Sequence, residues 1–365
     1  MGDLALHEFH RGLGAHFTTV NGSEVVDHYG DALAEHLALR DAAGVLDLSF
    51  RGRLCLVGAD RQKFLNGQVT NNVKDLNVGE GCYAALVTAK GKMQSDLNVF
   101  CLAEELLLDF EPGLTHLVTQ RLEKYIIADD VQVVDAAPHY GLLSVQGPKA
   151  EAVIRSLNLG VPAPMKPMTF TASLDAALGQ LYLMNLRRLD TSGFDLFAPN
   201  ASLATLADRL FGAVKSVGGR ACGWQALEIA RIEAGIPRFG ADMDESNLPP
   251  EAGIEARAIS YTKGCYIGQE VIARIRTYGQ VAKSLRGLRL ADDLKALPAR
   301  GDKLLKDGKE VGYLTSAVAS PTFKANLALG YVRREVNQPG TELRLRGAID
   351  ESPAIVVELP FNPSR

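Results

Sequence analysis

Apolar and polar residues alternate with a period of two over several segments in the first part of the chain, a pattern typical of β-strands with one buried face. The clearest case is 82–102, where CYAALVT and DLNVFCL flank the turn AKGK. This predicts a β-hairpin with Gly91 in its turn. Further strands are expected at 52–58 (GRLCLVG), 105–110 (ELLLDF), 131–135 (VQVVD), 142–147 (LLSVQG), 180–187 (QLYLMNLR) and 193–199 (GFDLFAP).

Helical periodicity appears between these strands. Apolar residues three and four positions apart predict amphipathic helices at 31–41 and 114–126. Asp60 is expected to cap another helix that follows it directly. Helices are also expected at 148–157, 201–213 and 223–235. Because strands and helices are mixed along one region, the predicted fold class is α+β.

The pattern changes at about residue 284, where short strands separated by Gly, Asp and Pro turns replace the mixture. No helical periodicity follows, which predicts a separate all-β domain, a small barrel or sandwich. A chain of 365 residues is longer than one core usually organises, so two or three domains are expected. We therefore divide the chain into residues 1–283, with two interleaved α+β subdomains, and a C-terminal β-barrel domain at 284–365.

The charge balance limits the range of partners. Lys and Arg number 39 against 43 for Asp and Glu, so the net charge is −4 and there is no overall basic field. Nucleic-acid binding would therefore need a local patch. A cationic run comprises Arg274, Arg276, Lys283 and Arg286, with Tyr278 between them. It would suit a phosphate backbone or a polyglutamate tail, but a solvated surface is the simpler explanation, and no direct nucleic-acid partner is expected.

Cysteine and histidine usage narrows the chemistry. The five cysteines are scattered and have no CxxC spacing, which argues against a disulfide framework and against zinc or cluster ligands, so no metal site is predicted. All seven histidines lie at or before His139. The N-terminus has no leader pattern, and no apolar run reaches the roughly 18 residues that span a membrane. A cytoplasmic protein without a membrane partner is expected.

The most informative segment is KGCYIGQE, residues 263–270. A helix is expected to begin near Gly268, so Cys265 would lie just before a helix N-terminus and two residues from Lys263, which favours the thiolate. Two glycines also let the backbone approach a ligand closely. The simpler alternative is that Cys265 fills buried space and the glycines only shape a turn, because free cysteines are commonly buried and inert.

Arg231 is a second unusual residue, because it lies on the apolar face of the predicted helix 223–235, four residues after Leu227. A guanidinium that points inward is rarely buried without a partner. It would therefore meet a carboxylate or line a polar pocket, or it would pair with Glu228 on its own helix.

Three aspartates lie beside predicted turns. Asp96 begins the strand DLNVFCL, and Asp190 and Asp195 flank the segment TSGF. Each would face a cleft, or would only end a turn, and the turn is the default interpretation.

Several segments carry a resemblance that runs nearly from end to end: AAGVLDLSFRGRLCLVGADRQKFLNGQVTNNV, LLSVQGPKA, RIEAGIPRFGADMDESNLPPEAG, VGYLTSAVASPT with LALGYV, and KGCYIGQE. Together they resemble the aminomethyltransferase-like folate-binding superfamily, which includes the glycine cleavage T-proteins. T-proteins have a Lys-Gly-Asp-Phe-Ile-Gly-Arg-Glu-like string at the last segment, whereas YgfZ-type folate-binding proteins have Lys-Gly-Cys-aromatic-x-Gly-Gln-Glu. In Cys265 and Gln269 the chain is similar to the YgfZ type, which favours a functional Cys265 over a space-filling one.

The resemblance implies a three-domain fold around a central channel that holds tetrahydrofolate or a one-carbon derivative of it. Asp96 matches the acidic position beside the folate N5, and Asp96 and Cys265 are the implied catalytic residues. A carboxylate can pair with the adjacent N–H donors of a pterin and can stabilise a cation or manage its proton. The implied cofactor-binding residues are Arg231, Asp195, Lys263, Gly264, Tyr266 and Gln269.

The chain also departs from the pattern of the superfamily. T-proteins and their relatives have a Thr-Gly-Glu-Asp-Gly-like string where residues 189–193 read LDTSG, so that Thr191 takes the place of the glutamate. Ser95 stands where T-proteins often have the first of two aspartates. These changes weaken the expectation of aminomethyl transfer more than that of folate binding.

Three functions follow. The first is support of iron–sulfur cluster assembly or repair, and through it of cluster-dependent tRNA modification, with Cys265 as the essential thiol. The second is tetrahydrofolate-dependent aminomethyl transfer with Asp96 in the acid–base role. The third is RNA binding along 274–286. The resemblance leaves open whether the protein is an enzyme; if it is, a folate-dependent one-carbon or aminomethyl transferase is expected. The expected partners are a folate and iron–sulfur assembly proteins, and the expected state is a monomer.

Overall fold

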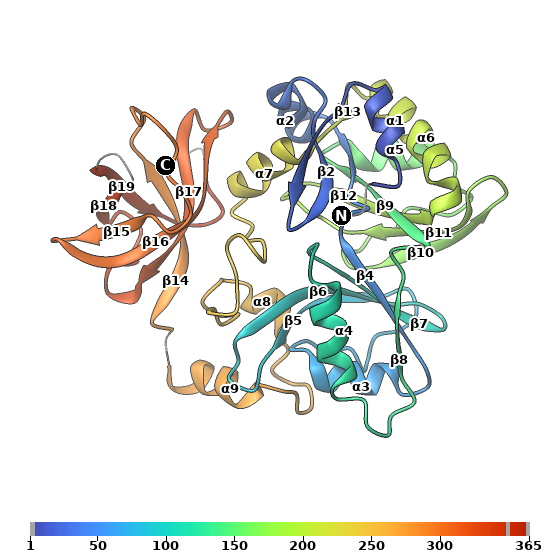
Figure 1. The fold of residues 1–365 in the computed structure, drawn as a ribbon, viewed down its shortest axis with the longest axis horizontal. Helices are drawn as coiled ribbons and strands as arrows, with labels where there is room; N and C mark the ends of the chain where they lie inside the picture. Colours follow the sequence, from blue (N-terminus) through green and yellow to red (C-terminus); the bar gives the residue numbers. More distant parts are fainter. Residues whose placement is uncertain (1–3, 280, 348–350, 363–365) are drawn as a thin grey trace. The chain divides into compact units, whose positions relative to one another are not determined.

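The structure, a computed structural model, describes residues 4–279, 281–347 and 351–362. The chain forms two compact units, each with its own core (Figure 1). Unit 1 comprises Met1–Leu86, Ser95–Glu228 and Thr262–Tyr266, and unit 2 comprises Val87–Gln94, Ile229–Tyr261 and Ile267–Arg365. The segment KGCYIGQE is therefore divided between the units after Tyr266.

A five-stranded sheet in unit 1 has the order β5-β6-β7-β4-β8. The expected hairpin is confirmed as β5 and β6, and Gly91 has the positive φ of 72° that its turn requires. Apolar residues of the strands pack with those of helices α3 and α4. These elements are β4 (Gly52–Val57), α3 (Arg61–Gln68), β5 (Gly81–Val87), β6 (Met93–Cys101), β7 (Glu105–Phe110), α4 (Thr115–Glu123) and β8 (Gln132–Asp135).

The capping role expected for Asp60 is wrong. Helix α3 begins at Arg61, directly after Asp60, but the Asp60 carboxylate makes no capping hydrogen bond. Its Oδ2 instead accepts from the backbone N–H of Asp130 at 3.0 Å. The side chain therefore joins the start of α3 to the segment before β8.

A six-stranded sheet in unit 1 has the order β10-β11-β12-β9-β3-β13 and a core that it shares with helices α5 and α6. Helix α2 begins after Asp31, whose side chain caps it. The elements are α1 (His7–Gly12), β1 (His16–Val20), β2 (Ser23–His28), α2 (Ala32–Asp41), β3 (Gly44–Asp47), β9 (Tyr140–Gln146), α5 (Ala150–Ser156), β10 (Phe170–Asp175), β11 (Gly179–Asn185), β12 (Gly193–Pro199), η1 (Asn200–Ser202), α6 (Leu203–Ser216), β13 (Arg220–Ala221) and α7 (Trp224–Glu233), the last of which continues into unit 2.

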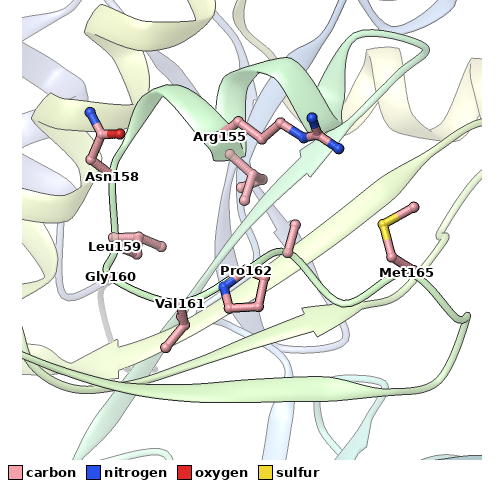
Figure 2. A pocket seen from close by; sticks show the side chains of 9 residues that line it. Arg155, Asn158, Leu159, Gly160, Val161, Pro162 and Met165 are labelled. Atoms are coloured by element: carbon pink, nitrogen blue, oxygen red, sulfur yellow. The ribbon is translucent and has the colours of Figure 1, made fainter.

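The proline-rich connection between α5 and β10 borders a surface cavity of about 560 Å³, whose lining Figure 2 shows. The lining is mostly apolar, with Leu159, Val161 and Met165 among its side chains. Its charged residue, Arg155, is paired with Glu151 one helical turn earlier. The cavity therefore presents an apolar wall without an uncommitted charge.

Unit 2 contains a closed six-stranded barrel in the order β14-β17-β16-β15-β18-β19 (Figure 1). The expected C-terminal β-barrel is thereby confirmed, and no α-helix follows β14 among the residues described there. The elements are α8 (Glu255–Ala258), α9 (Gln269–Tyr278), β14 (Lys283–Leu290), β15 (Lys303–Lys306), β16 (Lys309–Ser320), β17 (Ala325–Arg333), η2 (Arg334–Val336), β18 (Glu342–Arg346) and β19 (Glu351–Val357).

Among the described residues, no helix is both long enough and apolar enough to cross a membrane.

Candidate active site

The β5–β6 hairpin places a carboxylate beside a phenol. Tyr83 on β5 donates its hydroxyl hydrogen to Oδ2 of Asp96 on β6, at 2.8 Å. The other oxygen, Oδ1 of Asp96, is buried and has no hydrogen-bond partner among the described residues. A buried carboxylate oxygen is costly to leave without a donor, so Asp96 can accept from an N–H or O–H group that the described residues do not supply.

A buried network of charges lies close to this pair. Arg51 bonds to Asp109, with Nε–Oδ1 at 2.7 Å, and also to Glu111. Arg188 joins Asp109 at 3.0 Å to Asp195 at 2.6 Å, both from its Nη2. The network therefore links the five-stranded sheet, which carries Asp109, to β12 of the six-stranded sheet, which carries Asp195.

The pKa values of these carboxyl groups are shifted in opposite directions. Burial alone would raise the pKa of Asp109, but the charges of Arg188 and Arg51 outweigh it and hold that pKa well below its usual range. Burial raises the pKa of Asp96, and the negative charge of Glu111 raises it further. Burial likewise raises the pKa of Asp195, against the opposing effect of Arg188. Groups with opposite shifts in one site are typical of acid–base chemistry.

The network carries a surplus of negative charge. Asp96, Asp109, Glu111 and Asp195 face the guanidinium groups of Arg51 and Arg188, and the buried Arg53 also interacts with Asp109, which leaves one carboxylate in excess. The site therefore favours a ligand that is cationic or that presents N–H donors, and Asp96 is the carboxylate with an oxygen still available for it.

Replacing Asp96 by asparagine is expected to stabilise the protein by about 1 kcal/mol at pH 7, because it removes a buried charge with an unpartnered oxygen. The raised pKa makes the folded state bind this proton more tightly than the unfolded state, whose pKa is about 3.9. The loss of stability that the buried charge of Asp96 causes is therefore complete above its folded-state pKa and disappears below about pH 4. Urea unfolding of the wild type and of Asp96→Asn, at pH 7 and below about pH 4, measures this difference in stability.

The exposed residue Asp208 on α6 supplies the control, because Asp208→Asn removes a carboxylate without burial. It is expected to change stability by less than about 0.5 kcal/mol. A loss of stability in Asp96→Asn at pH 7 would show that Oδ1 already accepts a hydrogen bond, and it would contradict the inference that this oxygen is available to a ligand.

Lys263 lies in the same unit and is buried, and its ammonium is bound by the backbone. Its Nζ donates to the backbone carbonyls of Asn66, Val69 and Asn71 at 2.5, 2.8 and 2.7 Å, which uses all three of its donors. Burial lowers its pKa to about 8. Lys263 therefore organises the segment 66–71 that follows α3.

That segment in turn fixes the strand that carries Tyr83. Asn71 donates its side-chain amide to the carbonyl of Tyr83 at 2.8 Å, and Thr70 exchanges two hydrogen bonds with Ala85. The chain of contacts runs from Lys263 through the segment 66–71 to β5. Lys263 is thus a positioning residue for the phenol that holds Asp96.

The remaining residues of KGCYIGQE have different surroundings. Cys265 is exposed, and Gly264 is open to solvent, where a side chain would meet nothing within 4 Å. Tyr266 is buried, with its ring centroid 5.0 Å from Nζ of Lys263. Gln269 is half-buried at the first position of α9, as expected for a helix that begins near Gly268.

Arg231 belongs to unit 2, and its guanidinium is buried. It forms an ion pair with Asp242, and its Nη2 donates to the hydroxyl of Ser316 at 2.9 Å. The expectation that it meets a carboxylate is confirmed. Within unit 2 these contacts join α7 to the loop after it and to barrel strand β16.

Sequence analysis missed Tyr83 and most of the charge network. Asp109 did carry a signal, because it directly follows three consecutive leucines in the predicted strand 105–110. A charged residue in such a strand needs a buried partner. Arg51 and Arg188 carry no comparable signal, because each is one of two arginines close together in the sequence, beside Arg53 and Arg187 respectively.

The comparisons with known proteins agree with this architecture. Residues 6–263 match the GCVT N-terminal domain and residues 283–362 match the glycine cleavage T-protein C-terminal barrel domain. Aminomethyltransferases from Bacillus velezensis and Streptomyces avermitilis are 28% and 29% identical, in each case over 98% of this chain and 96% of the relative. The structure of the glycine cleavage system aminomethyltransferase T from Bartonella henselae superposes with a TM-score of 0.88 at 24% identity and covers 100% of this chain and 99% of that one.

A five-stranded antiparallel sheet, a six-stranded mixed sheet and a closed barrel define the aminomethyltransferase-like fold. The chain belongs to the GCVT family, whose N-terminal domain matches most of its length. The relatives are named aminomethyltransferases, which favours the T-protein alternative over the YgfZ-type interpretation.

Proposed function

We propose that this protein binds tetrahydrofolate and acts as an aminomethyltransferase. The observation that carries the proposal is Asp96, a carboxylate with one oxygen held by Tyr83 and the other buried without a donor. The superfamily resemblance puts this position beside the folate N5. The names of the relatives support the same activity.

The residues present fit a folate. An N–H group of the ligand would satisfy the unpartnered oxygen of Asp96, and the surplus negative charge suits the donor-rich edge of a pterin. Thr191 stands where the superfamily has a glutamate, and its Oγ1 is also buried without a partner among the described residues. Two polar atoms at positions that the resemblance assigns to the cofactor thus have no hydrogen-bond partner in the part of the chain that the structure describes.

Asp96 would act as the proton-handling group. Bound tetrahydrofolate would supply the amine that accepts the one-carbon unit. Transfer would break the C–S bond to the lipoyl carrier and release ammonia and the carrier thiol. Oδ1 of Asp96 would take the proton of the folate amine and return it to one of these leaving groups, while Tyr83 keeps the carboxylate oriented through Oδ2. The raised pKa of Asp96 brings its proton affinity closer to that of a general base working near neutral pH. Asp109 stays ionised and fixes Arg51 and Arg188.

The test is formation of methylenetetrahydrofolate with an aminomethyl-loaded lipoyl carrier protein, together with calorimetric titration of the pure protein with tetrahydrofolate. Asp96→Asn is expected to lower turnover by about 10²-fold or more. Asp208→Asn is the matched control and should leave turnover unchanged. Absence of tetrahydrofolate binding by the wild type, or full turnover by Asp96→Asn, would overturn the proposal.

A second candidate rests on Cys265. Its thiol is exposed, and Lys263, two residues earlier, is bound by three backbone carbonyls. The exposed sulfur therefore lies next to a firmly held part of the backbone. This favours the thiol-dependent support of iron–sulfur proteins that the YgfZ-type resemblance implies. Rescue of a strain that lacks its own homologue decides between the two. Loss of rescue in Cys265→Ala with rescue retained in Asp96→Asn would select the second candidate, and the reverse pattern would select aminomethyl transfer.

A further inference from the structure

The barrel is apolar on part of its outer face as well as inside. Along β17, Ala328 and Val332 point into the barrel core, whereas Leu327 and Leu329 belong to a separate cluster on the opposite face of the strand. The outer face of a barrel that is exposed to water is expected to be polar. We therefore expect this apolar outer face to be covered, by another part of the chain or by a ligand.

Part of this outer apolar cluster is covered by the chain itself, through Ile232 at the end of α7 and the segment after β19. Another part borders a cavity of about 860 Å³, within the range of small-molecule sites. The cavity lies against outward residues of β14, β17 and β19, between the β16–β17 turn and residues 357–362. Its apolar lining includes Leu327, Leu359, Phe323 and Phe361, and the two phenyl rings meet edge to face with centroids 6.1 Å apart.

The walls of the cavity are held by contacts of their own. The backbone N–H and the hydroxyl of Thr322 donate to the Glu233 carboxylate, which fixes the turn before β17. On the other side, Leu359 packs so closely on Gly287 that a side chain there would come within 2.9 Å of it. The cavity is therefore formed without a ligand.

The charged residues of the lining do not balance. Arg289 and Lys324 line the cavity, and neither has an ion pair or a side-chain hydrogen bond among the described residues. Glu358 is the single acidic residue of the lining, so that two cationic groups and one anionic group leave a charge of +1. An apolar wall with unpaired cationic groups matches a ligand that has an apolar body and an anionic head.

We propose that this cavity is a binding site for a small carboxylic acid with an apolar body, such as a medium-chain or aromatic acid. The body packs on Phe323, Leu327 and Phe361, and the carboxylate is bound by Arg289 and Lys324. The site lies wholly within unit 2 and uses none of the residues assigned to the active site. It is independent of the proposed transferase activity.

Calorimetric titration of the full-length protein with decanoate, below its micellar concentration and at pH 7.5, tests the site. Saturable binding at one site per chain is expected, and decylamine, with the same body and the opposite charge, should bind at least about tenfold more weakly. The Arg289→Gln/Lys324→Gln double variant should lose about tenfold in affinity for decanoate. Glu358→Gln should bind decanoate more tightly, because it removes the opposing charge.

Two further variants separate the site from unspecific binding. Lys309→Gln removes an exposed lysine of the same barrel that does not line the cavity, and it should bind decanoate like the wild type. Ile355→Asp places a carboxylate in the cavity at a position that is already 39% exposed, so the barrel should fold and binding should be lost. Equal binding of decanoate and decylamine, unsaturable binding, or an unchanged affinity in the double variant would each overturn the proposal.

Discussion

Replacing Arg188 by leucine is expected to lower the free energy of unfolding by about 3–5 kcal/mol, because it leaves buried carboxylates without their counter-charge. Asp195 has no exposed surface, and its ion-pair partner among the described residues is Arg188. Asp109 keeps Arg51 and Asn98 but loses the bond from Arg188. Urea unfolding at neutral pH measures the change without adding salt.

The double variant Arg188→Leu/Asp195→Leu is expected to recover part of the lost free energy of unfolding, because it removes the Asp195 carboxylate together with its ion-pair partner. Arg155→Leu is the matched control, since Arg155 and Glu151 form an exposed pair one helical turn apart. It should cost no more than about 0.5 kcal/mol. An Arg188→Leu variant as stable as the control would show that the network is solvated and would contradict its role as a rigid support of the site.

The elements of the fold follow from local patterns that tertiary packing does not override. The alternation on both sides of Gly91 gives β5 and β6 as expected, and the β17 pattern of apolar residues on both faces is explained by its two clusters. Asp60 shows where local reasoning fails. Its position before α3 is that of a cap, but the backbone of Asp130, seventy residues away in sequence, competes for the same carboxylate oxygen.

The site was harder to predict than the fold because its members meet only in three dimensions. Tyr83 and Asp96 lie on neighbouring strands, so the register of the hairpin could have predicted their contact. Asp109 lies on β7, whereas Arg188 lies in the connection between β11 and β12, and no sequence periodicity relates them. Resemblance directed attention to Asp96 and Asp195, but only the structure shows that Asp195 is bonded to Arg188 while Asp96 keeps an oxygen for a ligand.

This contrast gives the two aspartates different functions. Asp195 is fully buried and contributes to the scaffold that joins the five-stranded and six-stranded sheets. Asp96 as a whole residue is half-buried, and its buried Oδ1 keeps an unmet hydrogen bond. We therefore expect Asp195 variants to act mainly through stability and Asp96 variants mainly through turnover.

Replacing Lys263 by methionine is expected to destabilise the protein by at least about 3 kcal/mol, because three backbone carbonyls lose their donor at once. The segment 66–71 would lose its anchor, and with it the hydrogen bond from Asn71 that supports Tyr83. Turnover is expected to fall more in this variant than its remaining folded fraction explains. Urea unfolding and turnover, measured on the same preparation, give both quantities.

Lys263→Arg and Lys74→Met make this prediction specific. Arginine keeps the charge but not the compact geometry of three converging donors, so intermediate stability is expected. Lys74 is exposed, and its substitution should be nearly neutral. Burial lowers the pKa of Lys263 to about 8, against about 10.4 in the unfolded chain, so between these values the unfolded state binds more protons. The unfolding free energy of the wild type should therefore rise relative to that of Lys263→Met as the pH increases from 8 to 10, and an unchanged difference would show that Lys263 is not the buried ammonium that anchors the segment.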